Sequence, residues 1–193
     1  MSKIGILYFS GYGHAAKLAE AVERGAVAAG ARVGVHRISE TGEISPADWA
    51  ALSAADAFIY GAPTYMGGPA WQFKKIAEAS SKLWIDKAWK DKLAAGFTVS
   101  ASTNGDKFST IQYLWTLSQQ HGQIWVGTGV LPSNAKAHGP TDINWSGGFA
   151  GVTAIAPVDA SPEEAPHAGD IAVAEALGER VARLADRMAG ARP

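Results

Sequence analysis

Short apolar runs alternate with amphipathic segments along this chain of 193 residues, and this alternation restricts the possible folds more than any other feature. The run from Ile4 to Phe9 is nearly continuous, as expected of a strand buried on both faces of a sheet. In the segment that follows, apolar residues recur every three or four positions, which predicts a helix ending near Gly30. The opening unit is therefore a strand, a tight loop and a helix.

Similar units follow along the chain. We predict four more strands, over residues 32–38, 57–60, 95–100 and 124–130. Helices are expected after the capping box Ser45-Pro46-Ala47-Asp48, after a loop over 61–68 with Pro69 in the first helical turn, and after a loop over 102–107. A terminal helix carries a clear apolar stripe. Five strands, each followed by a helix, predict an α/β fold with one parallel sheet and helices on both faces.

The composition excludes several classes of protein. Apolar residues make up 47% and charged residues 18% of the chain, without an apolar run of the ~20 residues that span a membrane. Seventeen basic and eighteen acidic residues give a net charge of -1 without a basic cluster, so neither nucleic acid nor a membrane is an expected partner. We expect one domain over residues 1–193. A cytoplasmic location is also expected, because the first strand follows Met1 too closely for a signal peptide.

Metal and nucleophile chemistry are not expected. The chain has no cysteine, which excludes thiolate nucleophiles and cysteine-ligated metals. Its five histidines are scattered at positions 14, 36, 121, 138 and 167, without metal-ligand spacing. We therefore assign no catalytic side chain and no metal.

The first loop is the clearest candidate for a ligand site. In a parallel α/β sheet, ligands bind beyond the carboxyl ends of the strands, where the strand order reverses. The loop from Ser10 to Ala15 joins a buried strand to a helix N-terminus, and Gly11 and Gly13 allow a tight turn there. Free amide groups at a helix start favour an anion such as a phosphate. The alternative is a glycine-eased turn in which Ser10 only caps the helix.

This loop also matches a dinucleotide fingerprint, since residues 11–16 satisfy GxGxxA. That fingerprint requires an acidic residue ~20 positions later to hold a ribose hydroxyl. The chain has Ala29, Gly30, Ala31 and Arg32 in that region, and it lacks the second half of a classical dinucleotide-binding domain. We interpret the match as incidental.

Three loops together resemble a known family. They are Ser10-Gly11-Tyr12-Gly13-His14, Gly61-Ala62-Pro63-Thr64-Tyr65-Met66-Gly67 and Ser102-Thr103-Asn104-Gly105. They look like the phosphate loop and the two flavin loops of the flavodoxin-like NAD(P)H:quinone oxidoreductases of the WrbA type, and the resemblance extends from Lys3 to about Gly190. It implies a flavodoxin-like three-layer sandwich with a five-stranded parallel sheet in the order 2-1-3-4-5. It also implies non-covalent FMN at the edge of the sheet.

The resemblance implies which residues bind the cofactor. The FMN phosphate would be held by the first loop, that is by Ser10, Gly11, Tyr12, Gly13, His14 and Ala15. The segment of Pro63, Thr64, Tyr65 and Met66 would wrap the pyrimidine edge of the flavin, mainly through backbone donors. The other side of the ring would meet Ser102, Thr103, Asn104, Gly105 and Asp106. The family is richer in glycine in this third loop, and Asn104, Asp106 and Lys107 depart from its pattern.

Substrate contacts are implied for Tyr12, Trp84 and Trp145. Tyr12 would border the nicotinamide side of the pocket, or it is a partly exposed loop aromatic. Trp84 matches a family aromatic that contacts the substrate, although Trp84 and Trp89 equally suit a core or a subunit contact. Trp145 belongs to a long segment over 131–148 without periodicity, which would roof the flavin, meet a neighbouring subunit or pack on the surface.

A histidine that meets the flavin in the family aligns on Gln120, with His121 one position later, so the resemblance assigns neither residue. We interpret His121 as a cation placed favourably at a helix C-terminus.

These residues predict an FMN-dependent oxidoreductase that takes a hydride from NAD(P)H and passes two electrons to a quinone or a similar flat acceptor. The resemblance also implies a homodimer or homotetramer. One alternative is a flavodoxin-type carrier of single electrons. A net charge of -1 is poor support for such a carrier, and ordinary flavodoxins have threonines where this chain has Tyr12 and Ala15. The other alternative is a non-catalytic, FMN-binding regulatory protein.

Overall fold

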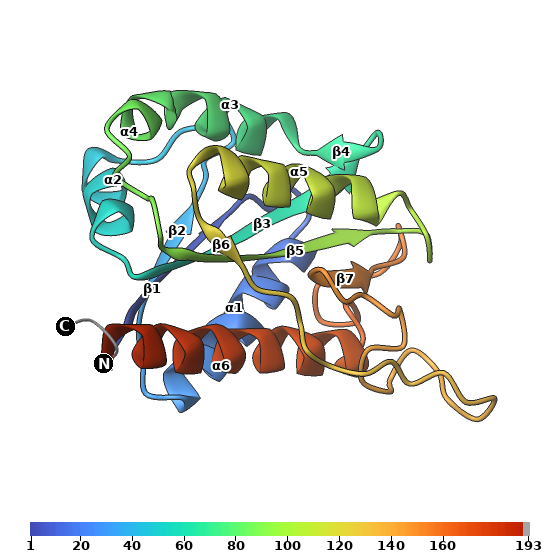
Figure 1. Cartoon of the computed structure of the whole chain (residues 1–193). Helices are drawn as coiled ribbons and strands as arrows, with labels where there is room; N and C mark the ends of the chain where they lie inside the picture. Colours follow the sequence, from blue (N-terminus) through green and yellow to red (C-terminus); the bar gives the residue numbers. More distant parts are fainter. Residues whose placement is uncertain (191–193) are drawn as a thin grey trace.

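The structure, a computed structural model, describes residues 1–190 and contains one main parallel sheet. Its strands are β1 (Lys3–Tyr8), β2 (Arg32–Arg37), β3 (Ala57–Tyr65), β5 (Leu93–Ser100) and β6 (Ile124–Trp125). They lie in the order β2-β1-β3-β5-β6, and every pairing along this order is parallel (Figure 1). This is the predicted order 2-1-3-4-5. The last three residues of the predicted domain lie outside the described part of the chain.

The fifth position of the sheet is divided between two segments. β6 pairs only with Leu93 and Ala94 of β5, and β7 (Val152–Ile155) pairs in parallel with the other end of β5, from Phe97 to Ser100. The predicted strand over 124–130 therefore ends earlier than expected, at Trp125. Beyond it, one backbone hydrogen bond to β5 remains, from the Val126 amide to the Ala94 carbonyl. Residues 126–130 contact the segment that leads into β7 instead, and the Thr128 amide donates to the Phe149 carbonyl at 2.9 Å.

The third strand is longer than its apolar run predicted. Residues 61–63 continue to pair with β5, and Gly61 allows this because the Phe97 ring occupies the space that a Cβ would need. The expected loop over 61–68 is thus mostly strand, followed by a tight turn at Met66 and Gly67, both with positive φ. β4 (Gly68–Pro69) folds back antiparallel onto the end of β3. Pro69 is therefore not in the first turn of the next helix, which begins at Trp71.

Helices cover both faces of the sheet, as predicted. α1 (His14–Ala28) and α6 (Ala168–Gly190) lie on one face, and α2 (Pro46–Ser53), α3 (Trp71–Ala79), α4 (Ser81–Ile85) and α5 (Lys107–Gln120) lie on the other (Figure 1). α1 and α6 touch through their backbones, because a Cβ on Gly178 would lie 2.0 Å from the Val22 carbonyl oxygen. The capping box at the start of α2 is present, with the Ser45 hydroxyl accepting from the Asp48 amide. No helix among residues 1–190 combines the length and apolar content needed to cross a membrane.

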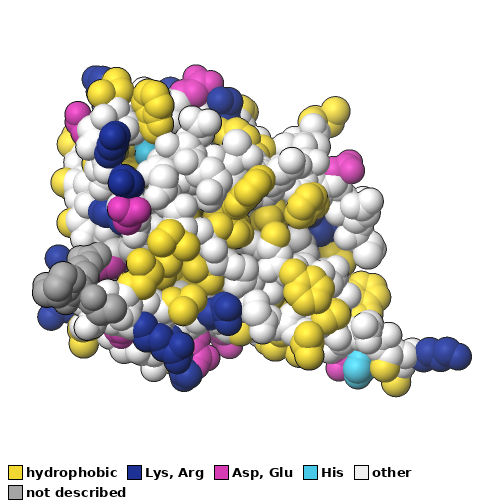
Figure 2. All heavy atoms as spheres, in the orientation of Figure 1, with side chains coloured by type: hydrophobic (Ala, Val, Ile, Leu, Met, Phe, Trp, Pro, Cys, Tyr) yellow, Lys and Arg dark blue, Asp and Glu magenta, His cyan; other side chains and the backbone are white. Residues whose placement is uncertain are grey.

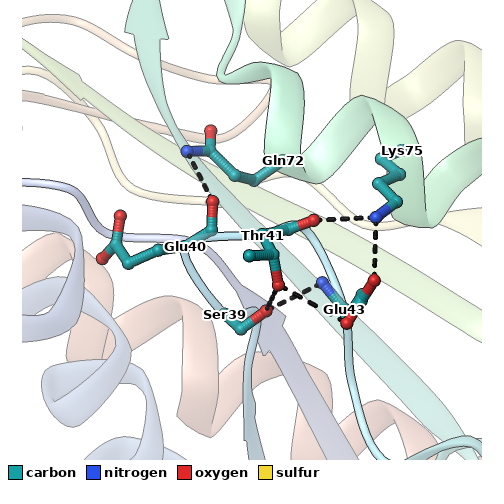
Figure 3. A network of polar contacts seen from close by, with 6 residues as sticks. All are labelled: Ser39, Glu40, Thr41, Glu43, Gln72 and Lys75. Carbon is teal, nitrogen blue, oxygen red and sulfur yellow. Dashed lines mark hydrogen bonds and ion pairs between the residues drawn. The ribbon is translucent and has the colours of Figure 1, made fainter.

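A polar network fixes the loop that follows β2 (Figure 3). The Lys75 ammonium of α3 donates to the Thr41 carbonyl at 2.8 Å and pairs with the Glu43 carboxylate at 3.0 Å. The Gln72 amide donates to the Glu40 carbonyl at 3.4 Å. The loop is thereby held against α3, with Glu40 near enough to raise the pKa of Tyr65 through its charge.

Candidate functional site

A cavity of about 500 Å³ opens at the carboxyl ends of β1, β3, β5 and β7, on the right of Figure 1. Four chain segments line it: Ser10 to Ala15 without Gly13, Pro63 to Tyr65, Val99 to Ala101, and Ala156 to Ala160 without Asp159. Its size is typical of a small-molecule or cofactor site. No Lys, Arg, Asp or Glu of the described residues lines it, so its polar character comes from backbone amides, hydroxyls and the His14 ring.

The first loop presents a row of amide donors. Among the described residues, none of the amides from Gly11 to Ala15 donates a hydrogen bond to another residue. Gly13, with φ of 91°, is the residue that precedes α1, so these amides include the unpaired ones that open a helix. The buried Ser10 hydroxyl accepts from the Ala16 amide at 3.2 Å, so Ser10 also contributes to the cap. The arrangement is one that binds a phosphate.

Two tyrosines form one rim of the cavity. The rings of Tyr12 and Tyr65 meet edge to face, with centroids 6.1 Å apart. Tyr12 is 76% exposed, whereas partial burial raises the pKa of Tyr65 to about 12. Tyr65 is therefore a neutral hydrogen-bond donor at physiological pH.

The fourth wall, over residues 156–160, was missed by the sequence analysis. The His14 Nε2 lies 3.0 Å from the Ala160 carbonyl oxygen, and because a carbonyl only accepts, Nε2 carries the hydrogen. A Cβ on Gly13 would lie 2.5 Å from Pro162, so the first loop also packs closely against this wall. The wall follows the second half of the divided fifth strand. The apolar run over 124–130 predicts that strand at another place in the chain, with its loop over 131–148.

None of the predicted third-loop residues, over 102–106, lines the cavity. Ser100 and Ala101, which precede that loop, line the cavity, whereas Thr103 and Asn104 line a second hollow of about 380 Å³, together with Lys107 and residues 146–151. Ser102, Gly105 and Asp106 line neither of these two spaces. From the second predicted loop, Pro63, Thr64 and Tyr65 line the cavity, whereas Met66 is fully exposed at the turn and does not.

The two tryptophans predicted to contact substrate do not line the cavity. Trp84 lies in α4, at the end of the molecule opposite the carboxyl ends of the strands (Figure 1), beside a third hollow that includes Gln120 and His121. Trp145 is half-buried in the segment that connects β6 and β7. Trp89 is a core residue, only 1% exposed.

His121 lies at the C-terminal end of α5, as expected, but the interpretation of its side chain as a cation is wrong. Its ring is buried against Trp89, with centroids 4.4 Å apart, and this desolvation lowers its pKa to about 4. The Ser80 hydroxyl donates to the Ala77 carbonyl and therefore accepts from His121 Nε2, at 2.9 Å. His121 is a neutral, structural side chain.

These features fit a mononucleotide. The volume, the unpaired amides of the first loop and the lack of carboxylates in the described lining all suit a ligand with a phosphate at one end and a flat ring at the other. Within residues 1–190, no three His, Asp or Glu side chains converge in a way that would hold a metal ion.

Comparisons with known proteins identify the family. The family model described as NADPH-dependent FMN reductase matches residues 4–137. A protein named flavodoxin FldP, from Pseudomonas aeruginosa, is 42% identical over 188 residues, which are 97% of this chain and 99% of that protein. An NAD(P)H dehydrogenase (quinone) from Azorhizobium caulinodans is 34% identical over 204 residues, covering 98% of this chain and 100% of the relative.

A solved structure agrees with this result. The crystal structure of the flavodoxin, WrbA-like protein from Agrobacterium tumefaciens has a TM-score of 0.77 and 43% identity, and the match covers 97% of this chain and 99% of that one. The predicted flavodoxin-like sandwich and the resemblance to the WrbA type are thereby confirmed. The chain belongs to the NADPH-dependent FMN reductase family and has a WrbA-like flavodoxin fold.

Proposed function

We propose that this protein is an FMN-dependent NAD(P)H:quinone oxidoreductase. The observation that carries the proposal is the cavity at the carboxyl edge of the sheet, where unpaired amides of the first loop and the β3 turn meet. Family membership and relatives named NAD(P)H dehydrogenase (quinone) support the same activity. The substrates are NAD(P)H and a quinone or similar flat acceptor, and the location of the protein is the cytoplasm, where this donor is available.

The phosphate of FMN binds to the first loop. The amides of Gly11 to Ala15 supply hydrogen bonds, and the N-terminus of α1 supplies a favourable dipole. The Ser10 hydroxyl keeps its own hydrogen for donation, since its oxygen accepts from Ala16. The His14 ring is held beside the site by Ala160.

The end of β3 would hold the flavin ring. The Thr64 hydroxyl is bonded to the hydroxyls of Thr98 and Thr110, each at 2.8 Å, so its side chain is used inside the protein and fixes the end of β3 beside the cavity. The β3–β4 hairpin keeps this backbone in place through the Ala70 amide, which donates to the Pro63 carbonyl at 3.2 Å. Met66 and the loop from Ser102 to Asp106 complete the ring site in this proposal.

When bound, FMN supplies the redox chemistry by accepting a hydride from NAD(P)H and returning two electrons to the acceptor. The chain positions this group, and its aimed amides favour the negative charge that develops on reduction. Tyr12 and Val158, 76% and 91% exposed, leave the rim open, so donor and acceptor use the same entrance in turn and solvent supplies the second proton. No side chain acts as a proton donor.

A second copy of the chain completes the substrate site. Trp84 is too remote from the cavity of its own chain to contact a substrate there, so its proposed role requires another subunit. Figure 2 shows hydrophobic side chains gathered over α5 and the segment between β6 and β7, and Phe108, Trp115 and Phe149 are exposed there. We infer a homodimer or homotetramer with Trp84 or Trp145 at a subunit contact. Light scattering would return a monomer mass if this is wrong.

A reconstitution experiment tests the activity. The protein is loaded with FMN, and oxidation of NADH and of NADPH is followed with and without benzoquinone. The proposal expects oxidation that depends on the quinone. Bound yellow flavin without turnover would instead indicate a regulatory FMN-binding protein.

The relative named flavodoxin FldP favours a second candidate function, a single-electron carrier. A redox titration distinguishes the two. A well-populated one-electron state together with no NAD(P)H oxidation would support the carrier.

A further inference from the structure

Lys107 is a buried lysine in the loop that follows β5. It is only 3% exposed although it is the first residue of α5. Its ammonium contacts the Ser100 hydroxyl at 3.0 Å, the Ser102 carbonyl at 2.7 Å and the Thr103 carbonyl at 2.8 Å. Gly105 lets the loop fold this tightly, because a Cβ there would lie 2.0 Å from the Ser100 hydroxyl oxygen. The loop from 100 to 105 is thus closed around one side chain.

The hydrogen bonds around Lys107 fit an ammonium group, which has a donor for each of the three contacts. The Ser100 hydroxyl donates its own hydrogen to the Ser102 carbonyl at 3.2 Å, so it accepts from Lys107. All three contacts then require an N–H on the lysine, and a neutral amine has only two. Lys107 is an ammonium, and all of its donors are used within this loop.

The ammonium also sets the direction of two peptide groups. The carbonyls of Ser102 and Thr103 point toward Lys107. In a trans peptide the N–H lies opposite the C=O, so the amides of Thr103 and Asn104 point away from the ammonium. Among the described residues, neither amide donates to another group. One side chain therefore prepares two free donors in the loop that is proposed to meet the flavin.

Lys107 lies directly behind the cavity wall, since the Ser100 that it contacts lines the cavity. The countercharge on the other side is Asp170, a buried carboxylate in the first turn of α6 that accepts from the Ile155 amide at 3.0 Å. Burial lowers the pKa of Lys107 and raises the pKa of Asp170 to about 6, and the opposite charge of each group partly offsets the shift of the other. A buried cation, Lys107, thus lies beside the carboxyl end of β5, and a buried anion, Asp170, lies beside the carboxyl end of β7.

We propose that Lys107 is an electrostatic positioning residue of the flavin site, which fixes the loop over 100–105 and stabilises the negative charge that FMN gains on reduction. This inference rests on the proposed function. In the resembled family this loop is richer in glycine. Here a side-chain cation both holds the loop and contributes its own field to the cavity.

The test compares the affinity of the protein for oxidised and for reduced FMN under anaerobic conditions. Lys107→Met is expected to weaken binding of reduced FMN about tenfold more than binding of oxidised FMN, the effect of one unit charge over roughly 10 Å at an effective dielectric constant near 20. The midpoint potential then becomes more negative by the matching amount. Lys107→Arg, which keeps the charge, retains most of the difference between the two affinities.

Asp170→Asn should change the relative affinity for reduced FMN in the opposite direction from Lys107→Met. It removes the negative charge, while an amide oxygen can still accept from Ile155. It is expected to tighten binding of reduced FMN relative to oxidised FMN. This variant decides the matter alone if Lys107→Met fails to fold. Equal effects on both redox forms, or none, would show that Lys107 is only structural and would overturn the inference. Failure of the wild-type protein to bind FMN would overturn the proposed function itself.

Discussion

The hydroxyl of Tyr65 lies across Gly11, 2.7 Å from the point that a Cβ on residue 11 would occupy. The turn at the end of β3 and the first loop therefore touch at the rim of the cavity. This contact is possible only because residue 11 has no side chain. The φ angle of Gly11 is not in the left-handed region, so space rather than backbone strain makes the glycine necessary.

Gly11→Ala is expected to displace Tyr65 and to weaken FMN binding about tenfold, the effect of ~1.4 kcal/mol. A fluorescence titration with FMN measures this change. Tyr65→Phe removes the oxygen that the new Cβ would meet, so the double variant should bind FMN nearly as well as Tyr65→Phe alone. Gly68→Ala, in the same hairpin, is the control, since a Cβ there has nothing within 4 Å. Additive losses in the double variant would contradict this account of Gly11.

A second prediction separates backbone strain from crowding in the first loop. Gly13 and Gly30 have nearly the same φ, 91° and 89°, but a Cβ on Gly13 would lie 2.5 Å from Pro162 and one on Gly30 would meet nothing within 4 Å. Gly30→Ala should cost about 1 kcal/mol of unfolding free energy. Gly13→Ala should cost at least ~1 kcal/mol more and should also weaken FMN binding. Chemical denaturation of the two variants measures the difference, and equal losses would refute the packing of Gly13 on Pro162.

The buried His121 predicts a loss of stability in mild acid. Its pKa falls from 6.5 to about 4 on folding, so the unfolded chain binds the proton first and stability declines as the pH drops from 6.5 to about 4. The full effect is about 3 kcal/mol, and the pH dependence due to His121 becomes small about one unit above pH 6.5. Asp170, with its pKa raised to about 6, acts in the opposite direction over part of this range.

His121→Gln isolates the histidine contribution, because Asp170 is present in both proteins. Urea unfolding between pH 4 and pH 7 should show a smaller acid loss in the variant than in the wild-type protein. The same slope in both proteins would mean that His121 already carries its charge in the folded state.

The contact between α1 and α6 gives a fourth prediction. Gly178→Ala should destabilise the protein by more than ~2 kcal/mol, since the new Cβ would meet the rigid backbone of Val22 at 2.0 Å. In the same helix, a Cβ on Gly190 would have no atom within 4 Å, so Gly190→Ala should leave the stability unchanged or raise it slightly. Thermal unfolding of the two variants measures this contrast, and a tolerated Gly178→Ala would show that the two helices are not in backbone contact.

The parallel α/β class and the first loop could be predicted because both depend on local patterns, whereas the order of the strands followed from the resemblance to a known family. The run from Ile4 to Phe9 and the glycines that follow it specify a buried strand and a tight turn within a few residues of each other. The capping box at Ser45 is equally local. The residues that form these hydrogen bonds and this apolar spacing are neighbours in the sequence, so the pattern can be recognised without the tertiary structure.

The division of the fifth strand between Ile124–Trp125 and Val152–Ile155 could not be predicted in this way. Residues 124–130 have the composition of a strand, but Thr128 bonds to Phe149, and the remaining space beside β5 is taken by a segment that follows 26 residues after β6. The wall over 156–160 was missed for the same reason. The position of Trp84 likewise depends on where α4 packs.

The local alternation of apolar runs and helical stripes thus determined the class of fold and the place of the phosphate loop, and the resemblance of three loops to a known family supplied the order of the strands. Only the tertiary structure decided which segment fills the edge of the sheet, that His121 is neutral, and that Lys107 is enclosed by its own loop as a charged group. These outcomes depend on desolvation and on contacts between residues distant in the chain, and such contacts exist only after the elements have packed.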